Sequence, residues 1–133
     1  MHQGEVCFLI GRGGAILWSD ASNSAVLLPD SRARWEAIWE RRAELEEIAH
    51  SHPLGPRAFS SEDETTMEAL TSALGRPLRF SVVAPEGMIA RQEGRNVRVG
   101  EEPWWAALLR LASGMTRARP RPRAGRPRAP RRR

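Results

Sequence analysis

Residues 50 to 63 gather the side chains of this sequence that are best suited to bind a metal ion. His50 and His52 follow the apolar pair Ile48-Ala49 and are separated by one residue. On an extended strand both rings point to the same side and offer two imidazole nitrogens to one cation. Asp63 lies near a predicted helix start, where it can serve as a third, anionic ligand. Three protein ligands leave a fourth position for water, which is typical of a catalytic rather than a structural zinc site.

Hydrolysis at such a site also needs a base for the proton of the water and a donor for the oxyanion. Ser60, three residues before the aspartate, is the candidate donor. Glu5 opens the apolar run 6–11 and is the candidate base at the mouth of a buried strand. Glu46 and Glu47, just before the histidines, are the rival bases, and we interpret them as solvated or strand-edge charges.

These residues resemble the JAMM or MPN+ (JAB domain) zinc metalloproteases of the compact prokaryotic type. That family has a distant glutamate, then H-[S/T]-H-P, seven residues from the second histidine to a serine, two more residues and an aspartate. The chain reproduces the spacing with His50-Ser51-His52-Pro53, Ser60 and Asp63. The resemblance implies hydrolysis of a peptide or isopeptide bond, with one zinc ion per chain held by His50, His52 and Asp63, Glu5 as general base and Ser60 stabilising the tetrahedral intermediate.

The compact members of the family imply a protein substrate, a small ubiquitin-like or sulfur-carrier protein whose C-terminal tail is trimmed. Eukaryotic deubiquitinases of the family grip ubiquitin with insertions, and the segment after Asp63 is too short to hold one. Family members usually carry a strand and a helix before the glutamate, whereas four residues precede Glu5. We expect either a truncated start or a minimal domain that lacks one layer of helix packing. A truncated domain would leave the strand at 5–10 partly uncovered, which predicts poor solubility or dimer formation.

The elements that position these residues follow from apolar periodicity, glycines and caps. We expect strands at 5–10, 15–19, 25–28, 44–52, 78–84, 88–92 and 96–99. We expect helices from Asp30 or Ser31 to Arg42, over 61–74 with Ser60 or Ser61 as cap, and over 104–112.

Two groups of apolar side chains are predicted to face the core. They are Trp35, Ile38 and Trp39 in the first helix and Trp105, Leu108, Leu109 and Ala112 in the last. The pattern predicts an α+β domain over residues 1–115 with a mostly antiparallel sheet flanked by helices. The resemblance implies the same architecture, the MPN/JAB (cytidine-deaminase-like) domain.

The charge is unevenly distributed along the chain. All 21 basic residues are arginines, against 16 acids, and residues 117–133 hold nine of the arginines and no acid. Residues 1–116 therefore carry 12 − 16 = −4. Residues 116–133 are predicted to be a disordered Arg/Pro-rich tail, either simply solvated or able to hold nucleic acid through phosphate contacts.

Cys7 is the single cysteine, so no internal disulfide forms, and a reducing compartment is expected. Its apolar surroundings predict a buried hydrophobe. No signal sequence or membrane-spanning run is present, which predicts a cytoplasmic protein without a membrane partner.

Two other interpretations remain open at this stage. One is a non-catalytic MPN-fold binding or scaffold module with a nucleic-acid-binding tail. The other is a relative of the RadC-type proteins, which share an H-x-H-P…S-x-x-D block. Those proteins carry Asn between the histidines and Ser-Gly after the proline, where this chain has Ser51 and Leu54-Gly55.

Overall fold

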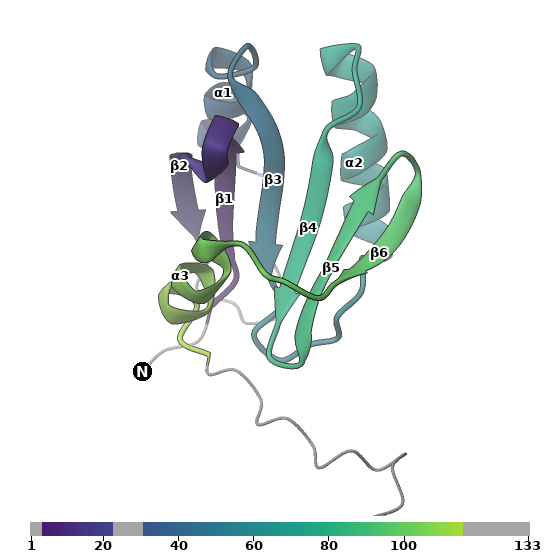
Figure 1. Ribbon diagram of the computed structural model, residues 1–133. Helices are drawn as coiled ribbons and strands as arrows, with labels where there is room; N and C mark the ends of the chain where they lie inside the picture. The colour runs from purple at the N-terminus through teal and green to yellow at the C-terminus, as the bar shows by residue number, and fades with distance from the viewer. Residues whose placement is uncertain (1–3, 23–30, 116–133) are drawn as a thin grey trace, which may run out of the picture.

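The computed structural model describes residues 4–22 and 31–115, which form one six-stranded sheet with helices on both faces (Figure 1). The strands are β1 Val6–Gly11, β2 Ile16–Ala21, β3 Leu45–Ser51, β4 Arg79–Ala84, β5 Gly87–Gln92 and β6 Arg95–Val99. The helices are α1 Arg32–Glu40, α2 Ser61–Leu74 and α3 Trp104–Ala112, and a short 3-10 turn covers Arg12–Gly14. The predicted strand 25–28 and the tail 116–133 lie outside the described residues.

The strand order is β2-β1-β3-β4-β5-β6, and every neighbouring pair except one is antiparallel. The exception is β3 with β4, which run parallel and are joined through α2, because parallel neighbours need a crossover connection. The predicted α+β class with a mostly antiparallel sheet is thus confirmed. Since β1 and β3 are antiparallel, the start of β1 and the end of β3 lie at the same end of the sheet. The start of α2 lies there too, because α2 follows β3.

Strand β1 is covered on both sides of the sheet. Val6, Phe8 and Ile10 belong to the core cluster that includes residues of α3, whereas Cys7 and Leu9 belong to the cluster that includes residues of α1 and α2. Helix α3 lies on one face of the sheet, and α1 and α2 lie on the other (Figure 1). Burial on both faces explains why the strand reads as a continuous apolar run rather than an alternating one. All six of its residues are buried, so the expectation of a partly uncovered strand was wrong.

The predicted helix caps are formed. The side chain of Ser31 accepts a hydrogen bond from the Arg34 backbone N–H at the start of α1. At the start of α2, Ser60 accepts from the Asp63 backbone N–H while the Asp63 carboxylate accepts from the Ser60 N–H, a capping box. Gly75 ends α2 with a φ of 69°, in the left-handed region that glycine enters without a Cβ penalty.

The faces that the short helices α1 and α3 bury were predicted less well. In α1 the core residues are Ala37 and Ile38, while Trp39 is 54 % exposed and lies under the guanidinium of Arg42. A nine-residue helix on a sheet buries one narrow stripe, and the small Ala37 permits closer packing than the indole of Trp39 would.

In helix α3 the buried residues also differ in part from those predicted. Trp105, Ala106 and Leu109 are buried as an i, i+1, i+4 stripe, and Leu108 and Ala112 are exposed, contrary to the prediction. The sequence of α3 is apolar on nearly all sides, so periodicity alone does not select the face that meets the sheet.

The neighbouring tryptophans of α3 offer a test of this core. Trp105 is 1 % exposed and Trp104 is 60 % exposed. We expect Trp105→Ala to lower the free energy of unfolding by about 3–5 kcal/mol, because it removes a large buried ring and leaves a cavity. The matched Trp104→Ala change should cost less than about 1 kcal/mol. Urea denaturation measures both, and equal losses would contradict the assigned face.

Candidate metal centre

Three segments that are distant in the sequence meet at the end of the sheet where β1 begins and β3 ends. Glu5 immediately precedes β1, and His50 and His52 lie at the end of β3. The strand register places Cys7 opposite His50, which brings Glu5 beside His52. Asp63 belongs to the first turn of α2, which begins at the same end because α2 follows β3. The fold therefore gathers the four predicted residues at one place.

His50, His52 and Asp63 converge with their ligand atoms close together. His50 Nε2 lies 3.1 Å from Asp63 Oδ1, His52 Nε2 lies 3.5 Å from Asp63 Oδ2, and the two Nε2 atoms are 3.1 Å apart. The three ligand atoms all lie within 4.8 Å of one another, so this group could hold a metal ion. Two imidazole nitrogens and a carboxylate oxygen are a donor set that suits zinc.

The ring of His52 is oriented by a hydrogen bond on its far side. Its Nδ1 lies 2.9 Å from the carbonyl oxygen of Pro56, which can only accept, so the Nδ1–H donates. A neutral His52 therefore has its lone pair on Nε2, the atom that faces Asp63. Holding the second ring nitrogen in this way is the usual support for a metal-binding histidine. The loop 53–59 thus has a part in the site that the sequence did not reveal.

Glu5 is a buried carboxylate next to these ligands. Its side chain is 6 % exposed, and its Oε1 lies 3.6 Å from His52 Nε2. Burial raises the pKa of Glu5 to about 7; the charge of Asp63 acts in the same direction, whereas His52 and Arg34 lower it. A general base works best when its pKa is near the operating pH, so the environment of Glu5 suits proton transfer at neutral pH.

The pKa values of the ion-pair partners Asp63 and His52 are shifted in opposite directions. Burial alone would raise the pKa of Asp63, but hydrogen bonds from His50 and His52 outweigh it and hold that pKa well below its usual range. Burial alone would lower the pKa of His52, but its bonds to Asp63 and Pro56 outweigh burial and raise it. Asp63 is consequently an anion at all physiological pH values, as a metal ligand must be.

Ser60 is joined to the cluster through Asp63. Its Oγ accepts from the Asp63 N–H at 3.0 Å, and its own N–H donates to Asp63 Oδ2 at 2.8 Å. A hydroxyl that accepts one bond still carries its own hydrogen, which remains a possible donor. The cap thereby holds the Ser60 hydroxyl beside the Asp63 carboxylate of the candidate ligand group, and its role as an oxyanion donor stays a prediction.

The rival bases do not reach the cluster. Glu46 is exposed and lies 4.0 Å from Arg12 at the other end of β3. Glu47 bonds Ser81 and Arg79, on the opposite face of β3 from His50, because strand residues three apart point to opposite sides. Burial raises the pKa of Glu47, yet its contacts are those of a structural ion pair.

A chain of hydroxyl groups behind the site was missed by the sequence analysis. Ser51, between the two histidines, accepts a bond from the Val6 backbone N–H at 2.9 Å, and its Oγ lies 2.6 Å from that of Ser113. The Ser113 hydroxyl also lies 2.7 Å from the Leu109 carbonyl, which only accepts. Ser113 therefore donates to Leu109, and Ser51 donates to Ser113. The chain satisfies the backbone next to Glu5 and ties it to the end of α3.

Cys7 and a surface pocket lie outside the cluster. Burial raises the pKa of the Cys7 thiol to about 12, so it stays protonated, as expected of a buried hydrophobe.

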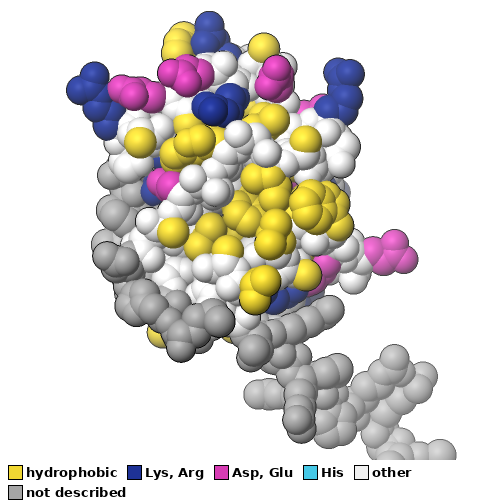
Figure 2. Space-filling view, turned by 90° about the vertical axis from the view of Figure 1, so that its left-hand side faces the viewer, with side chains coloured by type: hydrophobic (Ala, Val, Ile, Leu, Met, Phe, Trp, Pro, Cys, Tyr) yellow, Lys and Arg dark blue, Asp and Glu magenta, His cyan; other side chains and the backbone are white. Residues whose placement is uncertain are grey.

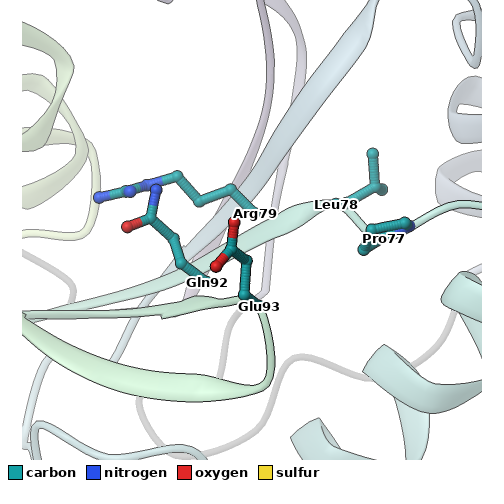
Figure 3. Close-up of a pocket in the computed structure, with 5 residues that line it drawn as sticks. All are labelled: Pro77, Leu78, Arg79, Gln92 and Glu93. Atoms are coloured by element: carbon teal, nitrogen blue, oxygen red, sulfur yellow. The ribbon is translucent and has the colours of Figure 1, made fainter.

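A pocket lined by Pro77, Leu78, Arg79, Gln92 and Glu93 lies where β4 begins and β5 ends (Figure 3). Arg79 pairs with Glu47, so this pocket is at the opposite end of β3 from the histidines.

Comparisons of the sequence with models of known protein families and with curated proteins find no match.

The raised pKa of Glu5 predicts a pH-dependent effect on stability. In the unfolded chain the carboxyl ionises near 4.5, but in the folded protein near 7, so stability falls as pH rises between these values. Glu5→Gln removes this penalty and should stabilise the metal-free protein on the order of 2 kcal/mol at about pH 8. Denaturation in chelator at about pH 8 and about pH 4 measures it. A stabilisation of equal size at both pH values would contradict the prediction.

Proposed function

We propose that this protein is a zinc-dependent metallopeptidase or isopeptidase of the JAMM type, with one zinc ion per chain. The observation that supports this most is the position of Glu5. Its buried carboxylate lies 3.6 Å from the Nε2 of His52, beside a three-residue ligand set. A structural metal site needs no such neighbour, and a buried carboxylate whose pKa is raised to about 7 is well suited to act as a general base.

Each residue has a role that follows from its contacts. His50, His52 and Asp63 would hold the ion, and zinc, when bound, polarises a carbonyl and lowers the pKa of water. Glu5 takes the proton from the attacking water and delivers it to the leaving amine. The Ser60 hydroxyl donates to the oxyanion of the tetrahedral intermediate.

The proposal also covers the family of the fold and the class of substrate. The six-stranded mixed sheet with helices on both faces is compatible with an MPN/JAB domain, and the spacing of residues 50–63 supports that assignment. The resemblance favours cleavage at the C-terminal tail of a small ubiquitin-like or sulfur-carrier protein.

A non-catalytic binding module is the second candidate, favoured by the nine arginines of residues 117–133. In that case the domain would scaffold a partner and the tail would hold nucleic acid in a salt-dependent manner. Binding would be indifferent to substitution of His50 or His52, which separates this candidate from the hydrolase.

Zinc content is the first measurement that separates the two candidates. We expect about one zinc ion per purified chain and a loss to background in His52→Ala, because two remaining ligands hold zinc weakly. His2, the only histidine outside the pair, provides the matched control, and His2→Ala should retain the ion. Elemental analysis gives the result, and a folded wild-type chain without zinc after reconstitution would favour the binding module.

Turnover tests the assignment of the base. We expect Glu5→Gln to keep its zinc while cleavage of carrier-protein fusions falls by about 10²–10⁴-fold, because the amide cannot accept the proton. Glu46→Gln changes an exposed carboxylate at the far end of β3 and should leave turnover unchanged. Undiminished cleavage by Glu5→Gln would exclude Glu5 as the base.

A further inference from the structure

Helix α3 exposes a second apolar face in addition to the one that packs on the sheet. Trp104, Leu108 and Leu111 are 60 %, 39 % and 64 % exposed. Their i, i+4, i+7 spacing places them in one row along the helix. The surface side of a helix that packs on a domain is normally polar, so this row needs a separate explanation.

The row belongs to a larger apolar surface. Figure 2 shows hydrophobic side chains gathered on the side of the molecule that carries β2 and α3. Ile16 of the edge strand β2 is partly buried and packs against the same core cluster as Trp105 and Leu109 of α3. Extended apolar patches of this kind mark interaction surfaces for proteins or lipids.

Positive charge begins where α3 ends. The described chain stops at Met115, which is buried, and residues 117–133 contribute nine arginines and no acid. At the other end of the helix, Glu102 is neutralised in a buried ion pair with Arg110. The apolar row is therefore followed directly by a charge of +9, on a chain whose remainder carries −4.

The combination of these features distinguishes between kinds of partner. A nucleic acid would pair with the arginines but would leave two leucines and an indole in water, and the tail has no aromatic residue to stack on bases. A membrane surface matches both features, because leucine and tryptophan enter the boundary between headgroups and acyl chains while arginines meet anionic headgroups. Two such signals together give stable peripheral binding where one does not.

We propose that the exposed face of α3, Trp104, Leu108 and Leu111, together with the arginines of 117–133, binds the surface of an anionic lipid bilayer. None of the helices in the described part of the chain is long and apolar enough to cross a membrane, so the association is peripheral. The sequence-based expectation of no membrane partner concerned spanning segments and did not consider this face. The proposal does not depend on the proposed hydrolysis.

Sedimentation with vesicles tests the proposal on the full chain. We expect binding to phosphatidylcholine vesicles that contain about one third phosphatidylserine, weakening at high salt, and no binding to phosphatidylcholine alone. Replacing Trp104, Leu108 and Leu111 by serine should reduce binding by about tenfold or more, because the apolar contribution is lost. Replacing the nine tail arginines by glutamine should abolish it. Trp39→Ser, at a 54 % exposed tryptophan of α1, is the matched control and should bind as the wild type does.

Three outcomes would overturn the proposal. Vesicle binding that the triple serine variant retains in full would mean that the tail alone acts as a polycation. Tight binding of duplex DNA, unaffected by the serine substitutions, with no vesicle binding would assign the tail to nucleic acid. A dimer in solution that the serine substitutions dissociate, again without vesicle binding, would make the face a contact between two copies of the chain.

Discussion

The antiparallel pairing of β1 with β3 is the constraint on which the site depends. Cys7 lies opposite His50, and this register places Glu5, two residues before Cys7, beside His52. A shift of one residue would exchange the apolar side chains of β1 between two core clusters that fit side chains of different size, and it would turn Glu5 away from His52. The apolar contacts of β1 on each face therefore set the distance between Glu5 and the two histidines.

Burial of β1 also determines the pKa of the Glu5 carboxylate. Every residue of β1 is buried, so Glu5 at its start also leaves water. Desolvation is the largest influence on its pKa, and the neighbouring ligands modify that influence with opposing signs. A metal site on an exposed edge would have left the carboxylate near its ordinary pKa, a poor base at neutral pH. The covered strand thus raises the pKa of Glu5 as well as stabilising the fold.

Local patterns in the sequence predicted the parts of the structure that local interactions determine. The bounds of α2, its Ser60 cap and the Gly75 terminus depend on residues a few positions apart. The ligand set within 50–63 was found for the same reason. The Ser51–Ser113 contact spans 62 positions and depends on how α3 docks, so no local pattern reveals it. The face that α3 buries was predicted correctly for Trp105 and Leu109 and wrongly for Leu108 and Ala112, because apolar residues occupy both sides of the helix.

Docking of α3 and geometry of the site are physically coupled. The Ser113 carbonyl accepts a hydrogen bond from the Gly4 N–H, and the Ser113 hydroxyl contacts Ser51, which in turn binds the Val6 N–H. The backbone on both sides of Glu5 is therefore held by one residue at the end of α3. Because unsatisfied buried backbone groups are costly, displacement of this helix would release the segment that carries the carboxylate. An interaction that immobilises α3 on its outer face consequently also restrains Glu5 relative to the histidines.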